Sequence, residues 1–149
     1  RLSLVGSEMC IRDSHYGDVS ALLSHGRGKT MGDGWETRRR REPGNDWIII
    51  KLATKGLIKK IEIDTAHFKG NYPDQASVQV SNFDQNKGLE EVINDSHNWK
   101  YILDKSKLQA DNIHNYEVND TSIKGVTHVR LNIYPDGGVS RLRMFGLKL

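Results

Sequence analysis

The chain has 149 residues, of which 36% are hydrophobic and 28% are charged, which is the size and composition of one soluble domain with a single core. No apolar run approaches the ~20 residues that span a bilayer, which excludes a transmembrane helix. The single cysteine, Cys10, excludes an internal disulfide and a multi-thiolate metal site, so we expect a cytoplasmic protein. The formal charge of +3 is too small to indicate a nucleic-acid-binding protein by itself.

The first residues show no pattern of a folded element. Arg1–Ser14 has no sustained hydrophobic periodicity and no charged segment followed by a long apolar core, as a signal peptide would have. The same run is similar to translated adaptor sequence at the ends of unrelated proteins. We therefore expect residues 1–15 to be a disordered or non-native head and the domain to span residues 16–149.

From Tyr16 onward, short strands alternate with segments rich in Gly, Pro, Asn and Asp. Ile61 and Ile63 would face one side of a strand and Lys60 and Glu62 the other, the period of two that is typical of a half-buried strand. A helical stripe is expected only in residues 86–94. The pattern predicts an all-β fold, an antiparallel jelly roll or β-sandwich. The expected strands are Trp47–Leu52, Leu57–Asp64, Ala76–Val80, Trp99–Leu103, Ile113–Val118, Val126–Ile133 and Val139–Leu147.

The last two expected strands are joined by a turn sequence. Tyr134–Gly138 reads Tyr-Pro-Asp-Gly-Gly, in which proline presets a turn and the glycines accept positive φ. We therefore expect these two strands to form a β-hairpin.

Charge is distributed unevenly along the chain. Residues 27–41 carry six basic side chains against two acids, whereas residues 81–120 carry eight acids against four lysines. A positive segment beside a negative one favours a local anion site over a long groove that follows nucleic-acid phosphates.

Three polar loops collect reactive side chains at strand ends: residues 25–41, 64–74 and 134–138. The first loop holds four glycines, which let the backbone approach a ligand and donate N–H groups to an anion. It is not a nucleotide-binding P-loop, because Gly28-Lys29-Thr30 lacks the glycine five residues upstream.

Four sequence blocks stand in a fixed order: Asp33–Arg39, Asp46–Trp47, Asp64–Asn71 and Tyr134–Val139, the last followed by Arg141 and Arg143. Together they resemble the allantoicase family, whose members hydrolyse allantoate to ureidoglycolate and urea in purine degradation. The resemblance covers roughly residues 16–146. It implies a jelly roll that is similar to galactose-binding and discoidin-like domains.

The resemblance also implies a larger protein. Allantoicases contain two homologous jelly-roll repeats, and one set of blocks is present here. The Gly-Arg-Gly sequence before the first block and the Ala-His-Phe form of the third are similar to the C-terminal repeat. We therefore expect a C-terminal repeat that packs against an N-terminal repeat missing from this chain, within a homo-oligomer. Whether the single repeat is active stays open.

Allantoate, the substrate that the resemblance implies, is a small carboxylate with two ureido groups on one carbon. Arg38 or Arg141 is expected to clamp the carboxylate, because a guanidinium binds it through two hydrogen bonds, with Lys69 in support. Asn71 and Asp136 are the other expected substrate-binding residues.

General acid–base catalysis without a cofactor or bound metal is expected at this site. His67 is the expected proton carrier at neutral pH. Glu36, Asp64 and Asp136 are expected to accept hydrogen bonds from ureido N–H groups or to act as the base. The expected reaction is acid-assisted loss of urea from the central carbon, followed by addition of water.

Each of these side chains also has a structural interpretation. His67 can hydrogen-bond within its loop, Glu36 can form ion pairs with the arginine run, and Asp136 is typical of turns. Asp64 and His67 provide only two ligands of a metal site, so no metal is expected. Three tryptophans are expected in the core: Trp35, Trp47 and Trp99.

A non-catalytic, discoidin-like carbohydrate-binding module remains the alternative function, because the fold alone does not separate binding from catalysis. Sugar-binding loops usually present aromatic platforms, whereas these loops are dominated by Arg, Asp, Glu and His. Nucleic acid is not expected as a partner, because alternate residues of an extended Arg38–Arg41 segment point to opposite sides. The ending Leu147–Leu149 departs from a peroxisomal address at its first residue, so cytoplasm is preferred to peroxisome.

Overall fold

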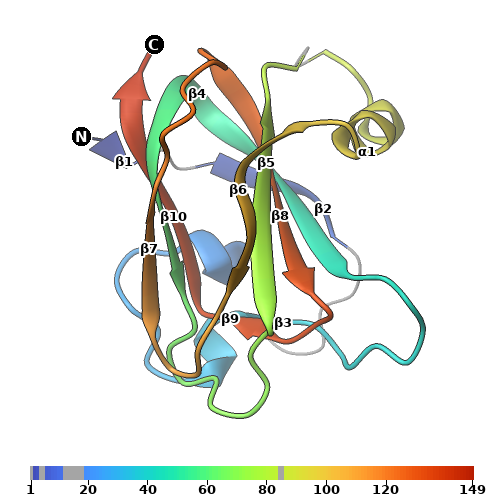
Figure 1. Cartoon of the computed structure of the whole chain (residues 1–149), viewed down its shortest axis with the longest axis vertical. Helices are drawn as coiled ribbons and strands as arrows, with labels where there is room; N and C mark the ends of the chain where they lie inside the picture. The colour runs from blue at the N-terminus through green and yellow to red at the C-terminus, as the bar shows by residue number, and fades with distance from the viewer. Residues whose placement is uncertain (1, 4–5, 12–18, 84–85) are drawn as a thin grey trace.

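The computed structural model describes residues 2–3, 6–11, 19–83 and 86–149, and antiparallel strands dominate it (Figure 1). In these residues the helical elements are α1 (Leu89–Ser96) and the short 3-10 helices η1 (Val19–Leu23) and η2 (Met31–Asp33). The strands are β1 (Leu2–Ser3), β2 (Gly6–Ile11), β3 (Trp35–Glu36), β4 (Asp46–Asp64), β5 (Gln75–Ser81), β6 (Lys100–Lys107), β7 (Ile113–Glu117), β8 (Val126–Tyr134), β9 (Gly138–Val139) and β10 (Arg141–Lys148).

β4 is the strand that both layers of the sandwich share. Its first half, from Asp46, pairs with β2 and β8, and its second half, up to Asp64, pairs with β10 and β7. The register with β8 shifts between Lys51 and Gly56, where the strand bends from one layer into the other. One layer therefore runs β2-β4-β8-β5-β6 and the other β1-β10-β4-β7 (Figure 1).

The two layers enclose one hydrophobic core. Ile48 and Ile50 reach it from the first half of β4, and Ile61 and Ile63 reach it from the second half. Each of these side chains is at most 1% exposed, and burying one contributes about 1.5–3 kcal/mol to the free energy of unfolding. The same core receives Val129, Leu131 and Ile133 from β8 and Leu142 and Met144 from β10.

A smaller apolar cluster lies on the outer side of the first layer. Ile49 of β4 packs there with Val92 of α1 and with Trp99, and Trp47 is partly buried against them. Trp35 is fully buried in the main core. The prediction of core tryptophans is therefore confirmed for Trp35 and Trp99, and Trp47 lies at the edge of the smaller cluster.

The predicted class, an antiparallel β-sandwich with one short helix, is confirmed. The expected strands Trp47–Leu52 and Leu57–Asp64 are the two halves of the single strand β4. Residues 53–56 look like a break because they include Gly56 and no large apolar side chain. The chain passes through them as a bend that keeps its pairing with neighbouring strands.

The predicted hairpin across Tyr134–Gly138 is wrong. β8 pairs with β4 between Asp46 and Gly56, and β10 pairs with β4 between Gly56 and Asp64, so the two lie in different layers. The turn carries the chain from one layer to the other, and β9 pairs with β3 at its exit. The turn therefore lies at the rim of the sandwich.

The sequence predicted no regular structure before Tyr16, but β1 and β2 lie in this segment. β1 pairs with β10, and β2 pairs with the first half of β4. Pairing of this kind uses backbone groups, so it needs no hydrophobic period in the added strand. The other residues of the predicted head are outside those that the structure describes, and its non-native origin stays a prediction.

The outer face of β8 buries polar side chains, which hold α1 on the sheet. Arg130 donates to Ser96 Oγ at the end of α1 (2.6 Å) and to Asn132 Oδ1 (2.8 Å). His128, which is 1% exposed, contacts the rings of Phe83 and Trp99 at centroid distances of 5.9 and 5.8 Å. This burial, and secondarily the charge of nearby Lys51, lowers the pKa of His128.

A pH-dependent stability follows from His128. An unfolded histidine titrates at a pKa of about 6.5, and the folded pKa is lower, so below about pH 6.5 the unfolded chain binds more protons. The free energy of unfolding, measured with urea, should therefore fall as pH drops from about 7.5 to 5.5, and H128Q should flatten this slope. H25Q, at an exposed histidine, should keep it. An H128Q slope equal to that of the parent would contradict the assignment.

Candidate functional site

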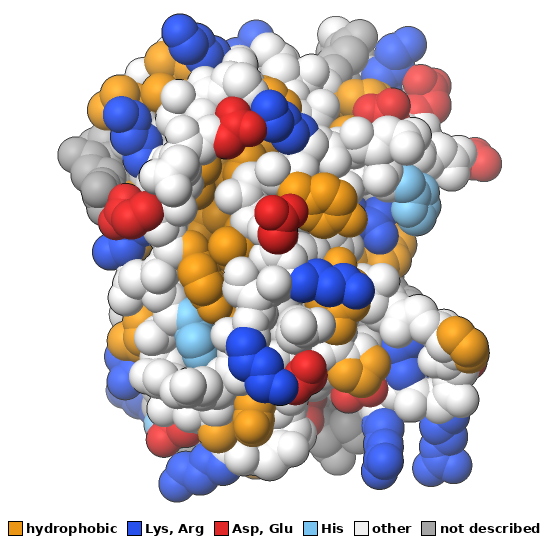
Figure 2. Space-filling view, viewed as in Figure 1, with side chains coloured by type: hydrophobic (Ala, Val, Ile, Leu, Met, Phe, Trp, Pro, Cys, Tyr) orange, Lys and Arg blue, Asp and Glu red, His pale blue; other side chains and the backbone are white. Residues whose placement is uncertain are grey.

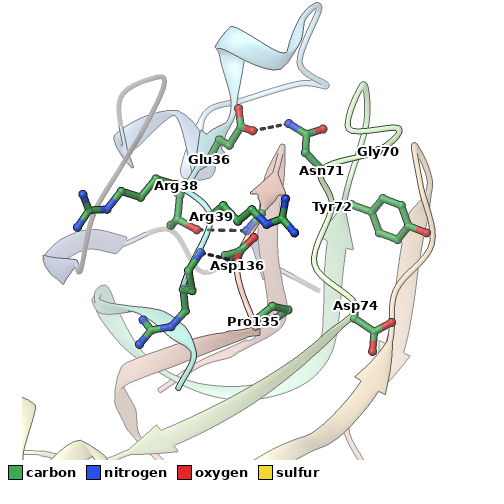
Figure 3. A pocket seen from close by; sticks show the side chains of 12 residues that line it. Glu36, Arg38, Arg39, Gly70, Asn71, Tyr72, Asp74, Pro135 and Asp136 are labelled. Carbon is green, nitrogen blue, oxygen red and sulfur yellow. Dashed lines mark hydrogen bonds between the residues drawn. The ribbon is translucent and has the colours of Figure 1, made fainter. Parts of the chain in front are cut away.

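Three loops meet at one end of the sandwich, the lower end in Figure 1. They are the segment after β3, the connection from β4 to β5, and the turn from β8 to β9. Between them lies an open cleft of about 880 Å³ (Figure 3), which we call the loop cleft. Its lining residues are Glu36–Arg40, Gly70–Tyr72, Asp74 and Pro135–Gly137.

Backbone hydrogen bonds at Gly137 and Gly138 join the three loops. The Thr37 N–H donates to Gly137 O (3.0 Å), and the Gly137 N–H donates back to Thr37 Oγ1 (3.2 Å). The Gly138 N–H donates to Asn71 O (2.8 Å). One short turn therefore fixes the positions of both other loops.

Glycine is required at this turn by close approach and by backbone conformation. Gly137 has a φ of 131°, which non-glycine residues rarely adopt. A Cβ on Gly137 would lie 2.7 Å from Asn71 O and 2.8 Å from Pro73 N. A Cβ on Gly138 would lie 2.0 Å from Phe68 Cε1. The two glycines of the predicted turn motif thus allow the turn to pack directly on the loop after β4.

Glu36 and Asn71 form one wall of the loop cleft. Glu36 is at the end of β3, paired opposite Gly138 of β9, and is only 8% exposed. Its Oε2 accepts a hydrogen bond from Asn71 Nδ2 (Figure 3). This pair places a carboxylate and an amide beside each other, which suits a ligand with both N–H donors and carbonyl acceptors.

Asp136 and Arg40 form the opposite wall. The Arg40 N–H donates to Asp136 Oδ2 (2.8 Å), which ties the segment after β3 to the turn before β9. The Arg40 guanidinium donates to Asp46 Oδ1 (2.8 Å), and the two side chains are 9% and 0% exposed. Arg40 therefore has a structural role.

The neighbouring arginines diverge. In Figure 3 the Arg38 side chain points away from the loop cleft, and the Arg39 side chain points across it toward Asn71 and Tyr72. This is the arrangement of successive residues in an extended chain. Of the two, Arg39 is the one whose guanidinium lies over the cleft.

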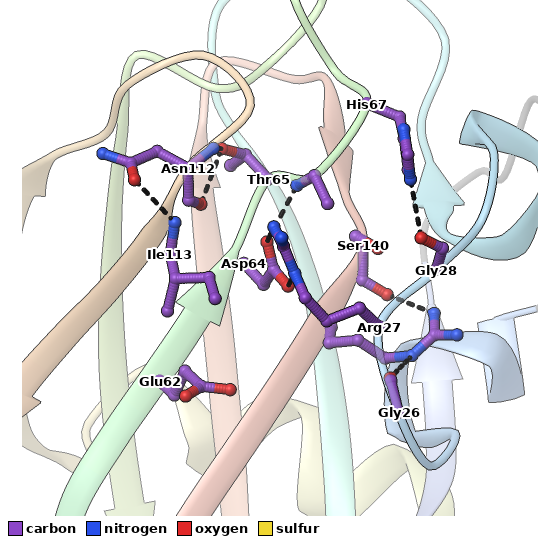
Figure 4. Close-up of polar contacts among 12 residues, drawn as sticks. Gly26, Arg27, Gly28, Glu62, Asp64, Thr65, His67, Asn112, Ile113 and Ser140 are labelled. Atoms are coloured by element: carbon purple, nitrogen blue, oxygen red, sulfur yellow. Dashed lines mark hydrogen bonds and ion pairs between the residues drawn. The ribbon is translucent and has the colours of Figure 1, made fainter.

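A second polar group, the Asp64 cluster, lies at the end of β4 and includes Arg27, Asp64 and His67 (Figure 4). Its fourth member is Arg141, which is paired opposite Asp64 in the sheet. Asp64 is 1% exposed, and both of its oxygens accept from Arg27, each at 3.0 Å. His67 Nε2 lies 2.6 Å from Gly28 O, and the His67 backbone has a φ of 72°. These contacts hold the segment between η1 and η2 against the strand ends.

Arg141 belongs to the Asp64 cluster and is 5% exposed. Its guanidinium donates to the backbone carbonyls of Gly26 (3.0 Å), Asp33 and Ser140 (2.7 Å). These bonds use Nε and Nη1, so neither edge of the guanidinium keeps both of the donors that a two-bond carboxylate clamp needs. Burial lowers the pKa of Arg141, whereas the hydrogen bond to Asp64 raises the pKa of Arg27.

The carboxylates of half-buried Asp33 and exposed Asp111 complete the support of this segment. Asp33 accepts from the N–H groups of Lys29 and Thr30, which lowers its pKa. Asp111 accepts from the His67 N–H, which lowers its pKa, and the charge of exposed Lys69 acts in the same direction. Both carboxylates accept hydrogen bonds from loop N–H groups, and neither belongs to the lining of the loop cleft.

The structure thus divides the expected site residues into two groups. It brings Glu36, Arg38, Asn71 and Asp136 together in the lining of the loop cleft. Asp64, His67 and Arg141 lie in the Asp64 cluster, and Lys69 is an exposed residue of the loop after β4. Lining residues that sequence reasoning missed include Arg39 and Tyr72, although alternation along the arginine run was a usable signal for Arg39.

Among the described residues, no group of three or more His, Cys, Asp or Glu side chains is arranged to hold a metal ion. The helices of the described residues include no candidate for a membrane span. Figure 2 shows basic and acidic side chains interspersed over one face of the molecule.

Comparisons with known proteins agree on one family. A family model described as "Allantoicase repeat" matches residues 2–149. "Probable allantoicase 1" of Burkholderia mallei is 52% identical over 141 residues, which are 95% of this chain and 42% of that protein. The crystal structure of allantoicase from Saccharomyces cerevisiae is 40% identical with a TM-score of 0.79, and covers 93% of this chain and 39% of the yeast chain.

The same fold occurs without sequence similarity in a fucolectin from striped bass serum. Its TM-score is 0.70 at 10% identity, with 97% of this chain and 46% of the lectin covered, so the likeness concerns the fold alone. The chain spans about two fifths of the length of the curated relatives that it matches.

The turn at Gly137 can be tested by substitution. G137A puts a Cβ against the backbone of the loop after β4 at a positive φ, so it should lower the free energy of unfolding by about 1–3 kcal/mol. G70A is the matched control, because a Cβ there meets nothing within 4 Å and should change stability by less than about 0.5 kcal/mol. Equal urea midpoints for G137A and the parent would show that the turn is not held in this way.

Proposed function

Because this chain belongs to the allantoicase family, we propose that it forms one repeat of an enzyme that hydrolyses allantoate to ureidoglycolate and urea in purine degradation. The main observation in support is the loop cleft, where three loops bring together the side chains of Glu36, Arg39, Asn71 and Asp136. We propose that allantoate binds in this cleft.

The chemistry of allantoate supports this placement. Its carboxylate requires a cation, its ureido N–H groups require acceptors, and its ureido carbonyls require donors. Around one opening, the cation is Arg39, the acceptors are the carboxylates of Glu36 and Asp136, and the amide of Asn71 both donates and accepts. A short anion with two hydrogen-bonding arms fits a polar cleft better than an extended polymer does.

The reaction breaks one C–N bond at the central carbon. The electron pair of this bond goes to the departing urea nitrogen, which takes up a proton, while the nitrogen of the remaining ureido group supplies electrons to the central carbon. Water then adds its oxygen to that carbon and gives up a proton. One carboxyl group that first donates and then accepts a proton serves both steps.

Glu36 is the group we assign to this proton transfer. It lies in the cleft wall, mostly buried, and its position is fixed by the β3–β9 pair and by Asn71. Asp136 has one oxygen bonded to the Arg40 N–H, which favours a binding role for the turn that carries it. The His67 and Asp64 roles expected from the sequence remain competing proposals, with their side chains in the Asp64 cluster.

The assembly is part of the proposal. Relatives are more than twice as long as the matched region, which supports the expectation of a second, N-terminal repeat packed against this one. We also propose a homo-oligomer in the cytoplasm. The single repeat then provides the loop cleft, and the second repeat provides the remainder of the active enzyme.

The alternative, a non-catalytic carbohydrate-binding module, is not favoured. The likeness to the fucolectin is at 10% identity, whereas the allantoicases are 40–52% identical over almost the whole chain. The lining of the cleft is mainly charged and amide side chains with one aromatic ring, that of Tyr72.

Urea release tests the proposal. We would insert this chain into the Burkholderia mallei relative in place of its matching 141 residues and supply allantoate. The chimera should release one urea per allantoate consumed. E36Q keeps the size of the side chain but removes the carboxyl group, so it should lower kcat by about 100- to 10,000-fold.

His67→Asn in the same chimera separates the two proton carriers. If Glu36 transfers the proton, H67N should retain most of kcat, and the folding of both variants is checked by their urea midpoints. A normal kcat in E36Q together with loss of turnover in H67N would refute the assignment of Glu36. Absence of urea release by a folded parent chimera would refute the proposed function itself.

A further inference from the structure

We propose that Arg39 is the residue that binds the substrate carboxylate, and that the adjacent Arg40 holds the loop in shape. This inference rests on the proposed function, because it assigns a part of allantoate to one side chain of the loop cleft. It departs from the sequence-based expectation, which placed the carboxylate on Arg38 or Arg141.

The direction of the side chains separates Arg39 from Arg38. Both residues lie in the lining, but Figure 3 shows the Arg39 guanidinium directed across the opening toward Asn71 and Tyr72 and the Arg38 guanidinium directed outward. A carboxylate in the cleft therefore meets the Arg39 donors first. Because a guanidinium presents two parallel N–H groups, it can hold both carboxylate oxygens and fix the orientation of the ligand.

Arg40 fixes this direction. Its N–H donates to Asp136 Oδ2 (2.8 Å), and its guanidinium donates to Asp46 Oδ1 (2.8 Å), Pro43 O (2.9 Å) and Asn45 O (3.3 Å). With residue 40 held from both backbone and side chain, and Thr37 held by Gly137, the segment between them has little freedom to rotate. The backbone of Arg39 is thereby held so that its side chain leaves on the cleft side of the segment.

Among the charged lining residues, Arg40 and Asp74 have ionic partners within the protein, whereas none is found for Arg39 in the described residues. Arg40 is paired with Asp46, and Asp74 accepts from Lys107, so these charges are balanced within the protein. Within the described part of the chain, no side chain or carbonyl is bonded to the Arg39 guanidinium. Its charge is therefore available to an anion that enters the cleft.

The position of Arg39 also defines the substrate class. With the carboxylate on Arg39, the polar groups of the same cleft that are available to substituents on the neighbouring carbon are Glu36, Asn71 and Asp136. These groups accept N–H bonds, so the cleft suits short 2-ureido acids. Analogues without the negative charge leave the Arg39 guanidinium unpaired and should be selected against.

The test compares allantoate with its neutral primary amide in the chimera described above. The parent should prefer allantoate, measured as the ratio of the two kcat/KM values, and R39Q should lose about 10- to 100-fold of this preference, mainly through KM. R39K keeps the charge without the paired N–H groups and should lose less. A purely structural role of Arg39 would change both substrates equally and leave the ratio unchanged.

R41Q is the matched control for removal of one positive charge, because Arg41 is exposed and outside the lining of the loop cleft. It should keep the ratio of the parent. R38Q is the competing variant, and a loss of preference in R38Q equal to or larger than that in R39Q would overturn the assignment. Urea release by the parent chimera in that case would leave the proposed function standing.

If the parent releases no urea, the inference is still tested by binding. Ureidoacetate is titrated into the 149-residue chain and its R39Q variant, with the urea midpoints of both compared. At least tenfold weaker binding by R39Q supports the assignment of the carboxylate to Arg39, and equal or undetectable binding by both overturns it.

Discussion

The close approach of one turn to two loops is the constraint on which this end of the molecule depends. Gly137 and Gly138 let the β8–β9 turn bond directly to the backbone of Thr37 and Asn71, at distances that leave no room for a Cβ. Apart from this turn, the described contact between the end of β3 and the loop after β4 within the cleft is the side-chain hydrogen bond from Asn71 to Glu36. These backbone hydrogen bonds hold the three loops around the cleft.

Some charged side chains at this end of the molecule stabilise the loops, and others are directed into the loop cleft. The ion pairs of Arg40 with Asp46 and of Arg27 with Asp64 shape the loops, since the buried carboxylates of Asp46 and Asp64 are tolerated only when they are paired. Groups directed into open space, Arg39 above all, are left for a ligand. The four arginines therefore do not share one role, because neighbouring side chains of the run point to different sides of the segment.

The strands were predictable because β-sandwich strands alternate. Ile61 and Ile63 in β4 and Leu142 and Met144 in β10 face the core as their period of two predicts. The shared strand and the absent hairpin were not predictable, because pairing partners depend on contacts between distant segments that a local pattern does not contain. For the site, the residue types of the three polar loops indicated where to look, and Glu36, Asn71 and Asp136 of those loops lie in the cleft. Asp64, His67 and Arg141 share the same residue types but are bonded to Arg27 and to backbone carbonyls, which only the fold reveals.

We propose that allantoate binds in the loop cleft and not in the Asp64 cluster. The most direct measurement is a titration of the isotope-labelled 149-residue chain with allantoate, followed by backbone amide NMR shifts. Binding in the loop cleft should place the largest shifts on residues 36–39, 70–72 and 136–137. Shifts centred on Arg27, His67 and Arg141, with no shifts of the cleft residues, would contradict binding in the loop cleft.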